Sequence, residues 1–318
     1  MSLLYILIFV GSCFLLVRSG TWVVRSLTRI AKALEWSEFL VTFCLMAFAT
    51  SLPELFVGLS SAFHKVPQLS FGNIIGANIL NLTVGVAIGV LVAGGLRLET
   101  QVARRDSFYT ALFSFLPILL ILDGQLSRVD GIVLLGVLAF YLKQILKEKE
   151  KFAKVFEDKF KRDITQFKLF LKDVGIFFGG IALLLLAGEG VVRSVGFLAK
   201  DLNMPLVGVG IIFVSLGTVL PEITFGVRAI TMGHKEMVLG NFMGTVVINS
   251  TLILGLVSLI SPLKIANFSP YIVGILFTSI VALAFAIFTR THQQITKKEA
   301  LVLLGIYIIF IFFQMVAK

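Results

Sequence analysis

The chain has 318 residues, of which 58% are hydrophobic and only 14% are charged, and its mean hydropathy is +0.99. This composition excludes an ordinary soluble domain, whose surface needs more polar residues, and it indicates a membrane-embedded protein. The net charge of +10 is also compatible with a nucleic-acid partner. Basic residues in a membrane protein are more simply explained as markers of cytoplasmic loops, so we expect no nucleic acid.

Apolar segments long enough to cross a bilayer, at roughly 20 residues per helix, follow one another along nearly the whole chain. The sequence lacks the extended alternation of apolar and polar residues that indicates barrel strands. We therefore predict an all-α integral membrane protein of about ten transmembrane helices. The predicted spans are 3–28, 37–63, 69–94, 107–122, 125–146, 169–198, 206–232, 237–261, 270–289 and 299–316.

Lysine and arginine are unevenly distributed between the two sides of the predicted bundle. If the N-terminus is placed on side A, 20 of the 28 Lys and Arg residues fall in the side-B loops. By the positive-inside rule, side B is cytoplasmic, so we predict that both termini are extracytoplasmic in a multi-pass protein of the cell membrane. The first apolar run lacks the flanks of a signal peptide, so we expect it to be retained. Cys13 and Cys44 lie in apolar spans and indicate no disulfide framework.

The two halves of the chain match at a constant offset of 168 residues. Three groups of letters that chance seldom aligns fall in register: VVRS at 23–26 and 191–194, LPE at 52–54 and 220–222, and GN at 72–73 and 240–241. The offset carries the first span onto the sixth, and a shift of five spans reverses direction across the membrane. Inverted repeats of this kind are typical of secondary transporters, whose sites lie near the bilayer midplane.

The predicted organisation is therefore two inverted five-helix repeats, residues 1–146 and 169–318, joined by a charged linker. In the linker, residues 147–168, Phe152, Phe156 and Phe160 recur at helical spacing with lysines between them. We interpret the linker as a basic amphipathic helix on the cytoplasmic membrane surface. The alternative is a solvated linker with incidental phenylalanines.

Two acidic residues, Glu54 and Glu222, interrupt otherwise apolar spans at equivalent repeat positions. A carboxylate at that depth costs several kcal/mol unless it is paired, protonated or bound to a cation, so each indicates a functional site. The preceding prolines, Pro53 and Pro221, remove a backbone donor. We expect this to free carbonyl groups around residues 47–50 and 215–218, which would make a cation site together with the carboxylates.

Other oxygen-bearing side chains accompany the two glutamates in both halves. Calcium prefers carboxylate, amide, hydroxyl and carbonyl oxygens, whereas softer metals call for His or Cys. The three histidines fall in or beside loops, which argues against zinc, copper and iron. The candidate oxygen ligands are Thr50, Ser51, Glu54 and Asn81 from the first half and Ser215, Thr218, Glu222, Thr245 and Asn249 from the second. Asn81 and Asn249 could instead bond neighbouring helices together.

Two further features have structural explanations. Gly72 and Gly76, with their repeat mates Gly240 and Gly244, have the small-xxx-small spacing that lets helices approach closely. Glu189, whose repeat position is Thr21, has no acidic mate. We interpret it as a partner of a nearby arginine rather than as part of the site.

These residues resemble the calcium/cation antiporter superfamily, and in particular its Na⁺/Ca²⁺ exchanger branch. Residues 49–54, ATSLPE, and 217–222, GTVLPE, are similar to the family motif G-T-S-L-P-E. Residues 72–81 and 240–249 look like the companion motif G-N-x-x-G-S-N…N/D. The resemblance covers essentially all ten spans.

The resemblance implies a four-helix core, made of spans 2, 3, 7 and 8, that holds one Ca²⁺ or several Na⁺ ions while spans 1 and 6 slide across it. It implies that Glu54 and Glu222, with the carbonyls of Thr50 and Thr218, hold Ca²⁺. The sodium and water positions it implies are completed by Ala47, Ser51, Ser215, Asn81, Thr245 and Asn249. The protein is thus expected to be an antiporter with Ca²⁺ and Na⁺ as substrates, without a cofactor or an obligate protein partner.

Three positions depart from the family pattern: Asn249 replaces an Asp, Val219 replaces a Ser and Ala77 replaces a Ser. Each departure removes an oxygen or a charge, so the coupling ion remains open between Na⁺ and H⁺. The H⁺/Ca²⁺ branch typically carries an acid after G-N-x-x, where this chain has Gly76 and Gly244. Sodium is therefore the preferred coupling ion, and an H⁺/Ca²⁺ antiporter is the alternative.

Two other classes of function fit the sequence less well. A cation channel would need a similar site, but inverted repeats with broken helices favour alternating access. A membrane enzyme of the prenyl-transfer or metalloprotease kind would carry Asp-rich or H-E-x-x-H motifs, which the sequence lacks. We therefore do not expect an enzyme.

Overall fold

The computed structural model describes residues 2–33, 46–97, 101–149, 164–231, 233, 235–291 and 294–316. Within these ranges the chain is almost entirely helical. The first half forms α1 (Ser2–Ala33), α2 (Met46–Thr50), α3 (Leu52–Phe63), α4 (Pro67–Leu80), α5 (Val86–Ala93), α6 (Gln101–Leu120) and α7 (Arg128–Lys149). The second half forms α8 (Ile164–Asp201), α9 (Leu206–Val209), α10 (Ser215–Thr231), α11 (Glu236–Ile248), α12 (Leu254–Ile260), α13 (Ser269–Thr291) and α14 (Lys297–Val316).

Three short π-helices join some of these helices end to end. η2 (Asn81–Gly85) connects α4 to α5, η5 (Gly210–Val214) connects α9 to α10, and η6 (Asn249–Ile253) connects α11 to α12. Each of the three resulting units crosses the membrane as one span. A 3₁₀ turn, η3 (Ile121–Asp123), follows α6.

Every predicted span coincides with helical structure, so the ten-helix all-α membrane fold is confirmed. Among the described residues, seven helical segments are long and apolar enough to cross a membrane: Leu4–Leu27, Pro67–Ala93, Leu169–Asp201, Leu206–Thr231, Val238–Ile260, Ser269–Arg290 and Lys297–Val316. The other three predicted spans correspond to α2 with α3, to the shorter apolar helix Ser107–Asp123, and to α7. Residues 37–45 of the second predicted span lie outside the described residues.

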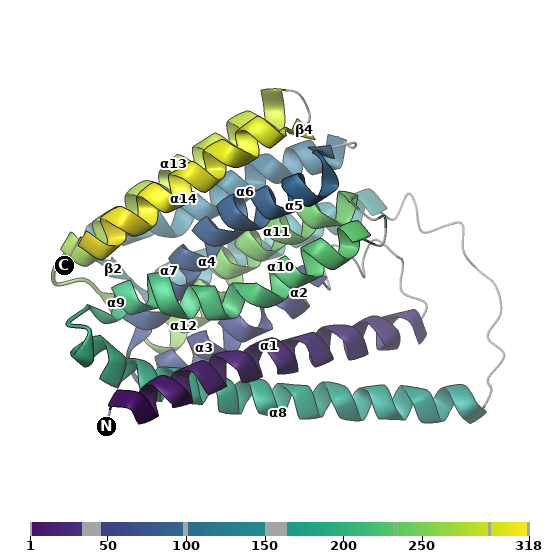
Figure 1. Ribbon diagram of the computed structural model, residues 1–318, viewed down its shortest axis with the longest axis horizontal. Helices are drawn as coiled ribbons and strands as arrows, with labels where there is room; N and C mark the ends of the chain where they lie inside the picture. Colours follow the sequence, from purple (N-terminus) through teal and green to yellow (C-terminus); the bar gives the residue numbers. More distant parts are fainter. Residues whose placement is uncertain are drawn as a thin grey trace.

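Two small antiparallel ribbons, which the sequence did not predict, tie the halves together. β1 (Leu96–Arg97) pairs with β4 (Gln294–Ile295), and β2 (Gln125–Leu126) pairs with β3 (Leu263–Lys264). Each ribbon takes one strand from each half, and the labelled strands β4 and β2 lie toward opposite ends of the bundle (Figure 1). This pairing is what two inverted repeats require, because the loops that meet belong to the same side of the membrane.

A pair of helices lies along each of two opposite edges of the bundle, on either side of a buried centre. α1 and α8 run side by side along one edge, and α13 and α14 pack together along the opposite edge (Figure 1). In the span Pro67–Ala93, 83% of the most apolar stretch is buried, against 11% in Leu169–Asp201. The span formed by α4, η2 and α5 is therefore the central element, and α8 faces lipid with most of its surface.

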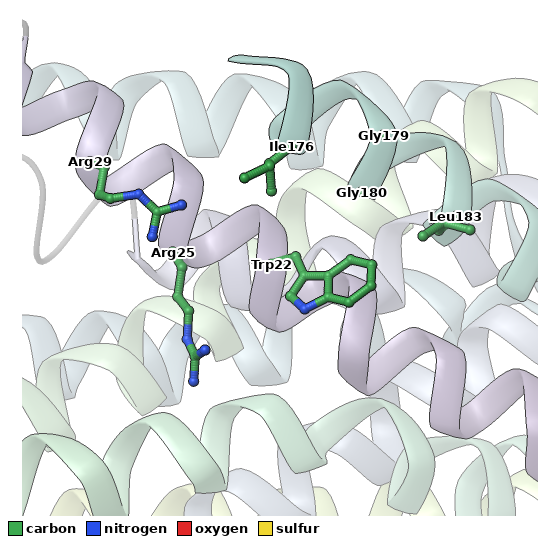
Figure 2. A pocket seen from close by; sticks show the side chains of 7 residues that line it. All are labelled: Trp22, Arg25, Arg29, Ile176, Gly179, Gly180 and Leu183. Atoms are coloured by element: carbon green, nitrogen blue, oxygen red, sulfur yellow. The ribbon is translucent and has the colours of Figure 1, made fainter. Parts of the chain in front are cut away.

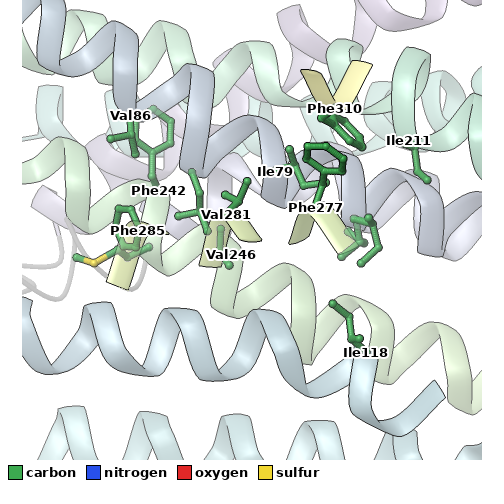
Figure 3. Packing of buried hydrophobic residues seen from close by; sticks show 14 of the residues in the cluster. Ile79, Val86, Ile118, Ile211, Phe242, Val246, Phe277, Val281, Phe285 and Phe310 are labelled. Atoms are coloured by element: carbon green, nitrogen blue, oxygen red, sulfur yellow. The ribbon is translucent and has the colours of Figure 1, made fainter. Parts of the chain in front are cut away.

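The main apolar core forms where the central span meets helices of the second half. Ile79 and Val86 of this span belong to the same buried cluster as Phe242 and Val246 of α11 and Phe277 of α13. Val86 is seen beside Phe242, and Ile79 beside Phe277 (Figure 3). The Phe277 and Phe310 rings of α13 and α14 have centroids 5.4 Å apart, which adds an aromatic contact to the buried area. The last helices of the chain thus cover the central span.

The predicted linker meets helices at both of its ends. α7 continues to Lys149 and α8 begins at Ile164, so the first and last residues of the segment 147–168 belong to these two helices. Residues 150–163, which include Phe152, Phe156 and Phe160, lie outside the described residues. The amphipathic surface helix therefore stays a prediction.

Candidate cation-binding site

The two intramembrane glutamates are completely buried. Glu54 lies in the first turn of α3, Glu222 lies inside α10, and each is 0% exposed. Among the described residues, none of their four carboxylate oxygens has a partner with hydrogen-bond geometry, although the Thr218 hydroxyl lies near Glu54. The two carboxylates also repel each other electrostatically. A buried pair of this kind is stable only with a cation or protons between its members.

The prolines have different effects in the two halves. In the first half the helix breaks before Pro53, because α2 ends at Thr50 and α3 begins at Leu52. In the second half α10 runs from Ser215 to Thr231 without interruption, with Pro221 inside it. The glutamate of the first half therefore lies at a helix N-terminus, where unpaired backbone N–H groups favour a negative charge, whereas Glu222 lies within a continuous helix.

The predicted carbonyl ligand at Ala47 already accepts hydrogen bonds. The Ser51 hydroxyl donates to it at 2.8 Å, the Thr50 hydroxyl at 3.3 Å and the Ser51 backbone N–H at 3.2 Å. The equivalent Ser215 hydroxyl donates to the Ile211 carbonyl. Each serine hydroxyl donates its hydrogen to a backbone carbonyl four residues earlier in the chain. The lone pairs of the hydroxyl oxygen therefore remain as acceptors for a cation.

Two symmetric hydrogen bonds connect the halves beside the glutamates. The Thr218 hydroxyl donates to Asn73 Oδ1 at 3.1 Å. The single hydrogen of the Thr50 hydroxyl is shared between the Ala47 carbonyl and Asn241 Oδ1, which lies 3.4 Å away. Thr50 and Thr218 are repeat mates, as are Asn73 and Asn241. Thr50 also lies 3.3 Å from the Thr245 hydroxyl. The structure thus places Thr50 against Asn241 and Thr245, and Thr218 against Asn73, at the interface of the two halves.

Asn81 and Asn249 each begin a π-helix. η2 and η6 start at these residues and are related by the repeat offset. A π-helix disturbs the regular backbone bonding and is frequent at functional sites. Both side chains are fully buried, and Asn81 Oδ1, Asn81 Nδ2 and Asn249 Oδ1 have no partner among the described residues.

Among the described residues, most of the buried side-chain polar atoms without a partner belong to three pairs of repeat mates. They are the carboxylate oxygens of Glu54 and Glu222, Oδ1 of Asn81 and Asn249 with Nδ2 of Asn81, and Nδ2 of Asn73 and Asn241. The oxygens can bind a cation, whereas the Nδ2 groups are donors and cannot. Buried polar groups are normally satisfied, so a symmetric cluster of unsatisfied ones indicates an absent ligand. Carboxylate, amide and hydroxyl oxygens without a thiolate or imidazole suit a hard cation such as Ca²⁺ or Na⁺.

Three asparagines of this cluster, Asn73, Asn241 and Asn78, were not among the candidate ligands predicted from the sequence. Asn78 donates from Nδ2 to the Ser250 hydroxyl at 2.8 Å and accepts a bond of 3.3 Å from Asn249 Nδ2. The repeat mate of Asn78 is Val246, so the search for matching letters gave no signal there. Its position three residues before Asn81, almost one turn away on the same helix, was the available hint.

The two structural explanations from the sequence are confirmed. An added Cβ at Gly72 would lie 2.2 Å from the Val207 carbonyl oxygen, so α4 does approach its neighbour closely there. Glu189 accepts a 2.6 Å bond from Arg193 Nε and lies 3.1 Å from His64 Nε2. Its side chain is 33% exposed and lies outside the cation cluster.

Comparison with known proteins agrees with this geometry. A model of the family described as sodium/calcium exchanger protein matches residues 4–145 and 172–316. The chain belongs to this family. The resemblance to the calcium/cation antiporter superfamily is thereby confirmed, and the family is one of transport proteins rather than enzymes.

Several curated proteins and solved structures are similar to this member of the family. The sodium/calcium exchanger MaX1 of Methanosarcina acetivorans is 26% identical, over 96% of this chain and 97% of that protein. The inner membrane protein YrbG of Escherichia coli is 28% identical, over 78% of this chain and 77% of that protein. The structure of the sodium-calcium exchanger NCX_Mj soaked with Na⁺ and Sr²⁺ matches with a TM-score of 0.66 and 25% identity, over 98% of this chain and 99% of that chain.

Proposed function

We propose that this protein is a secondary-active antiporter that exchanges Ca²⁺ for Na⁺ across the membrane by alternating access. The observation that carries the proposal is a pair of buried carboxylates, Glu54 and Glu222, at equivalent positions of two inverted repeats and without a hydrogen-bond partner among the described residues. Such a pair needs cations or protons to be stable in the membrane. Full-length relatives named for sodium and calcium exchange support these two ions as the substrates.

The proposed Ca²⁺ ligands are the carboxylates of Glu54 and Glu222 and the backbone carbonyls of Thr50 and Thr218. Calcium takes about 6–8 oxygens, so neighbouring groups and water complete its shell. The groups proposed to complete the sodium and water positions are the Ala47 carbonyl and the side chains of Ser51, Ser215, Asn81, Thr245 and Asn249. Their burial at the interface of the halves supports this assignment.

Charge balance supports two Na⁺ ions per Ca²⁺ ion. Glu54 and Glu222 carry two negative charges, and position 249 is a neutral Asn. One Ca²⁺ ion, or two Na⁺ ions, neutralises the two carboxylates. Bound ions with any other total charge would leave a net charge in a buried site. Calcium and sodium therefore compete for one site, and the exchange is electroneutral.

The ion coupling is tested in proteoliposomes loaded with Na⁺. An outward Na⁺ gradient is expected to drive uptake of radioactive Ca²⁺, and a clamped membrane potential is expected to leave the initial rate unchanged. A pH gradient without Na⁺ should give no uptake. Asn249→Asp adds a third carboxylate, so its exchange should become voltage-dependent.

Each alternative predicts a different result in the same vesicles. Uptake driven by the pH gradient alone would make the protein an H⁺/Ca²⁺ antiporter. Ca²⁺ flux that ignores both gradients would make it a cation channel. A wild-type rate that changes with voltage would contradict the two-sodium stoichiometry.

We also propose that both termini are extracytoplasmic and that the linker 147–168 is cytoplasmic. The excess of Lys and Arg on one side of the bundle supports this orientation. In a variant without native cysteines, Lys264→Cys is expected to react with an impermeant thiol reagent in intact cells. Lys298→Cys should react only after permeabilisation, and both side chains are exposed. The opposite labelling pattern would reverse the orientation.

A further inference from the structure

A cavity of about 430 Å³ opens between the two peripheral helices, α1 and α8. Its volume falls within the range of roughly 300–1,000 Å³ that is common for sites of small molecules. Trp22, Arg25 and Arg29 of α1 and Ile176, Gly179, Gly180 and Leu183 of α8 line it (Figure 2). The cation cluster contributes none of these residues, so the cavity is a separate feature of the molecule.

The cavity lies at the level where the apolar span of α1 ends. That span runs from Leu4 to Leu27, so Arg25 lies in its last turn and Arg29 lies just beyond it. Trp22 is 40% exposed beside them, and tryptophan prefers the boundary between hydrocarbon and headgroups. α1 and α8 form one edge of the bundle (Figure 1), so the cavity faces the headgroup region of the surrounding lipid.

The two arginines give this cavity a positive charge that the protein only partly neutralises. Arg29 Nη2 forms a 2.6 Å ion pair with Asp173. Arg25 is exposed and, among the described residues, has no hydrogen bond or ion pair. Figure 2 shows the guanidinium groups of Arg25 and Arg29 on different sides of α1. Because Arg25 is exposed and has no such bond within the described part of the chain, its side chain can turn to meet the same anion as Arg29, four residues along the helix.

The α8 side of the cavity is apolar and open. A Cβ added to Gly179 would have no atom within 4 Å, so the surface beside this residue is bare of side chains. Ile176 and Leu183 lie to either side of it along the helix. A hydrocarbon chain can therefore lie along α8 while a phosphate group lies at the arginine end.

We propose that this cavity binds one anionic phospholipid, with its phosphate between Arg25 and Arg29 and an acyl chain over Gly179. The net positive charge favours an anionic lipid over a zwitterionic one, and the apolar surface favours a lipid over free phosphate. The site does not depend on which ions the protein exchanges, and its test measures bound lipid rather than transport.

The test uses the full chain in nanodiscs of phosphatidylglycerol and phosphatidylcholine, with retained lipid measured by native mass spectrometry. The wild type is expected to retain one phosphatidylglycerol molecule in preference to phosphatidylcholine, and inorganic phosphate should not displace it. Gly179→Leu should weaken retention on the order of tenfold. This is the effect expected when about two methylene groups of the acyl chain are no longer buried. Gly11→Leu is the matched control, because Gly11 is also exposed on an apolar membrane helix with no atom within 4 Å of an added Cβ, and it lies toward the other end of α1, away from the cavity.

The charge is tested separately. Arg25→Gln should weaken retention about fivefold, the effect of one basic residue near an anionic surface. Arg228→Gln removes an equal charge from the exposed end of α10, on the same predicted side of the membrane, and should have no effect. Equal retention of the two lipids by the wild type would overturn the proposal. Retention unchanged in both cavity variants, or reduced equally in both controls, would overturn it as well.

Discussion

Replacing either buried glutamate by glutamine, as Glu54→Gln or Glu222→Gln, is expected to lower Ca²⁺ exchange by roughly 10²- to 10³-fold. Each variant removes one charge from a buried ion site and leaves the bound Ca²⁺ with an uncompensated charge, at about 3–5 kcal/mol. The shape of the side chain is kept, so the fold should survive. The initial rate of Na⁺-driven Ca²⁺ uptake in proteoliposomes measures the effect.

Glu189→Gln is the matched control for this experiment. It makes the same chemical change in a membrane helix, but Glu189 is partly exposed and paired with Arg193. A partly exposed ion pair contributes at most about 1 kcal/mol, so exchange should stay within about fivefold of the wild type. Wild-type exchange in Glu54→Gln or Glu222→Gln would remove that residue from the site. A comparable loss in Glu189→Gln would show that the assay reports general damage.

Gly76→Ala is expected to destabilise the protein by about 3 kcal/mol, at the upper end of the range for overpacking. The added Cβ would lie 2.1 Å from the Ile211 carbonyl oxygen and 2.6 Å from the Ser215 hydroxyl oxygen. The first of these is backbone, so relief requires a shift of α4 against η5. Thermal unfolding in detergent, followed by the loss of a monodisperse gel-filtration peak, measures the change.

Gly136→Ala tests the reason for this effect. Gly136 lies in α7 with no atom within 4 Å of an added Cβ. Alanine is the better helix former, so this variant should be as stable as the wild type or more stable by up to about 1 kcal/mol. If Gly76→Ala unfolds at the wild-type temperature, the close approach of α4 and η5 is not what holds these helices in place.

The helices and the inverted repeat were predictable because both depend on signals that lie in the sequence itself. A span of the bilayer requires a long apolar run, and Glu54 with Glu222 stands out because charge is so rare at that depth. The close packing at Gly72 followed from residue size alone. These features need no knowledge of which distant segments meet.

Other features depend on tertiary contacts and left no readable pattern. Pro53 and Pro221 occupy equivalent positions, yet only the first half breaks its helix there. The π-helices at Asn81 and Asn249 change the backbone hydrogen bonding, but no characteristic sequence motif marks them. Asn78 joins the polar cluster through partners 171 and 172 residues away, where the repeat offers no mate. Each depends on how the halves pack.

The two ribbons between the halves have a consequence for how the protein is made. The residues of β1 are synthesised early, but their partner β4 lies at residues 294–295, and α14, which packs against α5, is the last of the described helices. The nascent first half therefore enters the bilayer with the central span uncovered and with Glu54 and Asn81 lacking their counterparts. The ion site can be complete only after Asn249 has been synthesised, so truncations before this residue should yield products that the quality-control proteases of the cell remove.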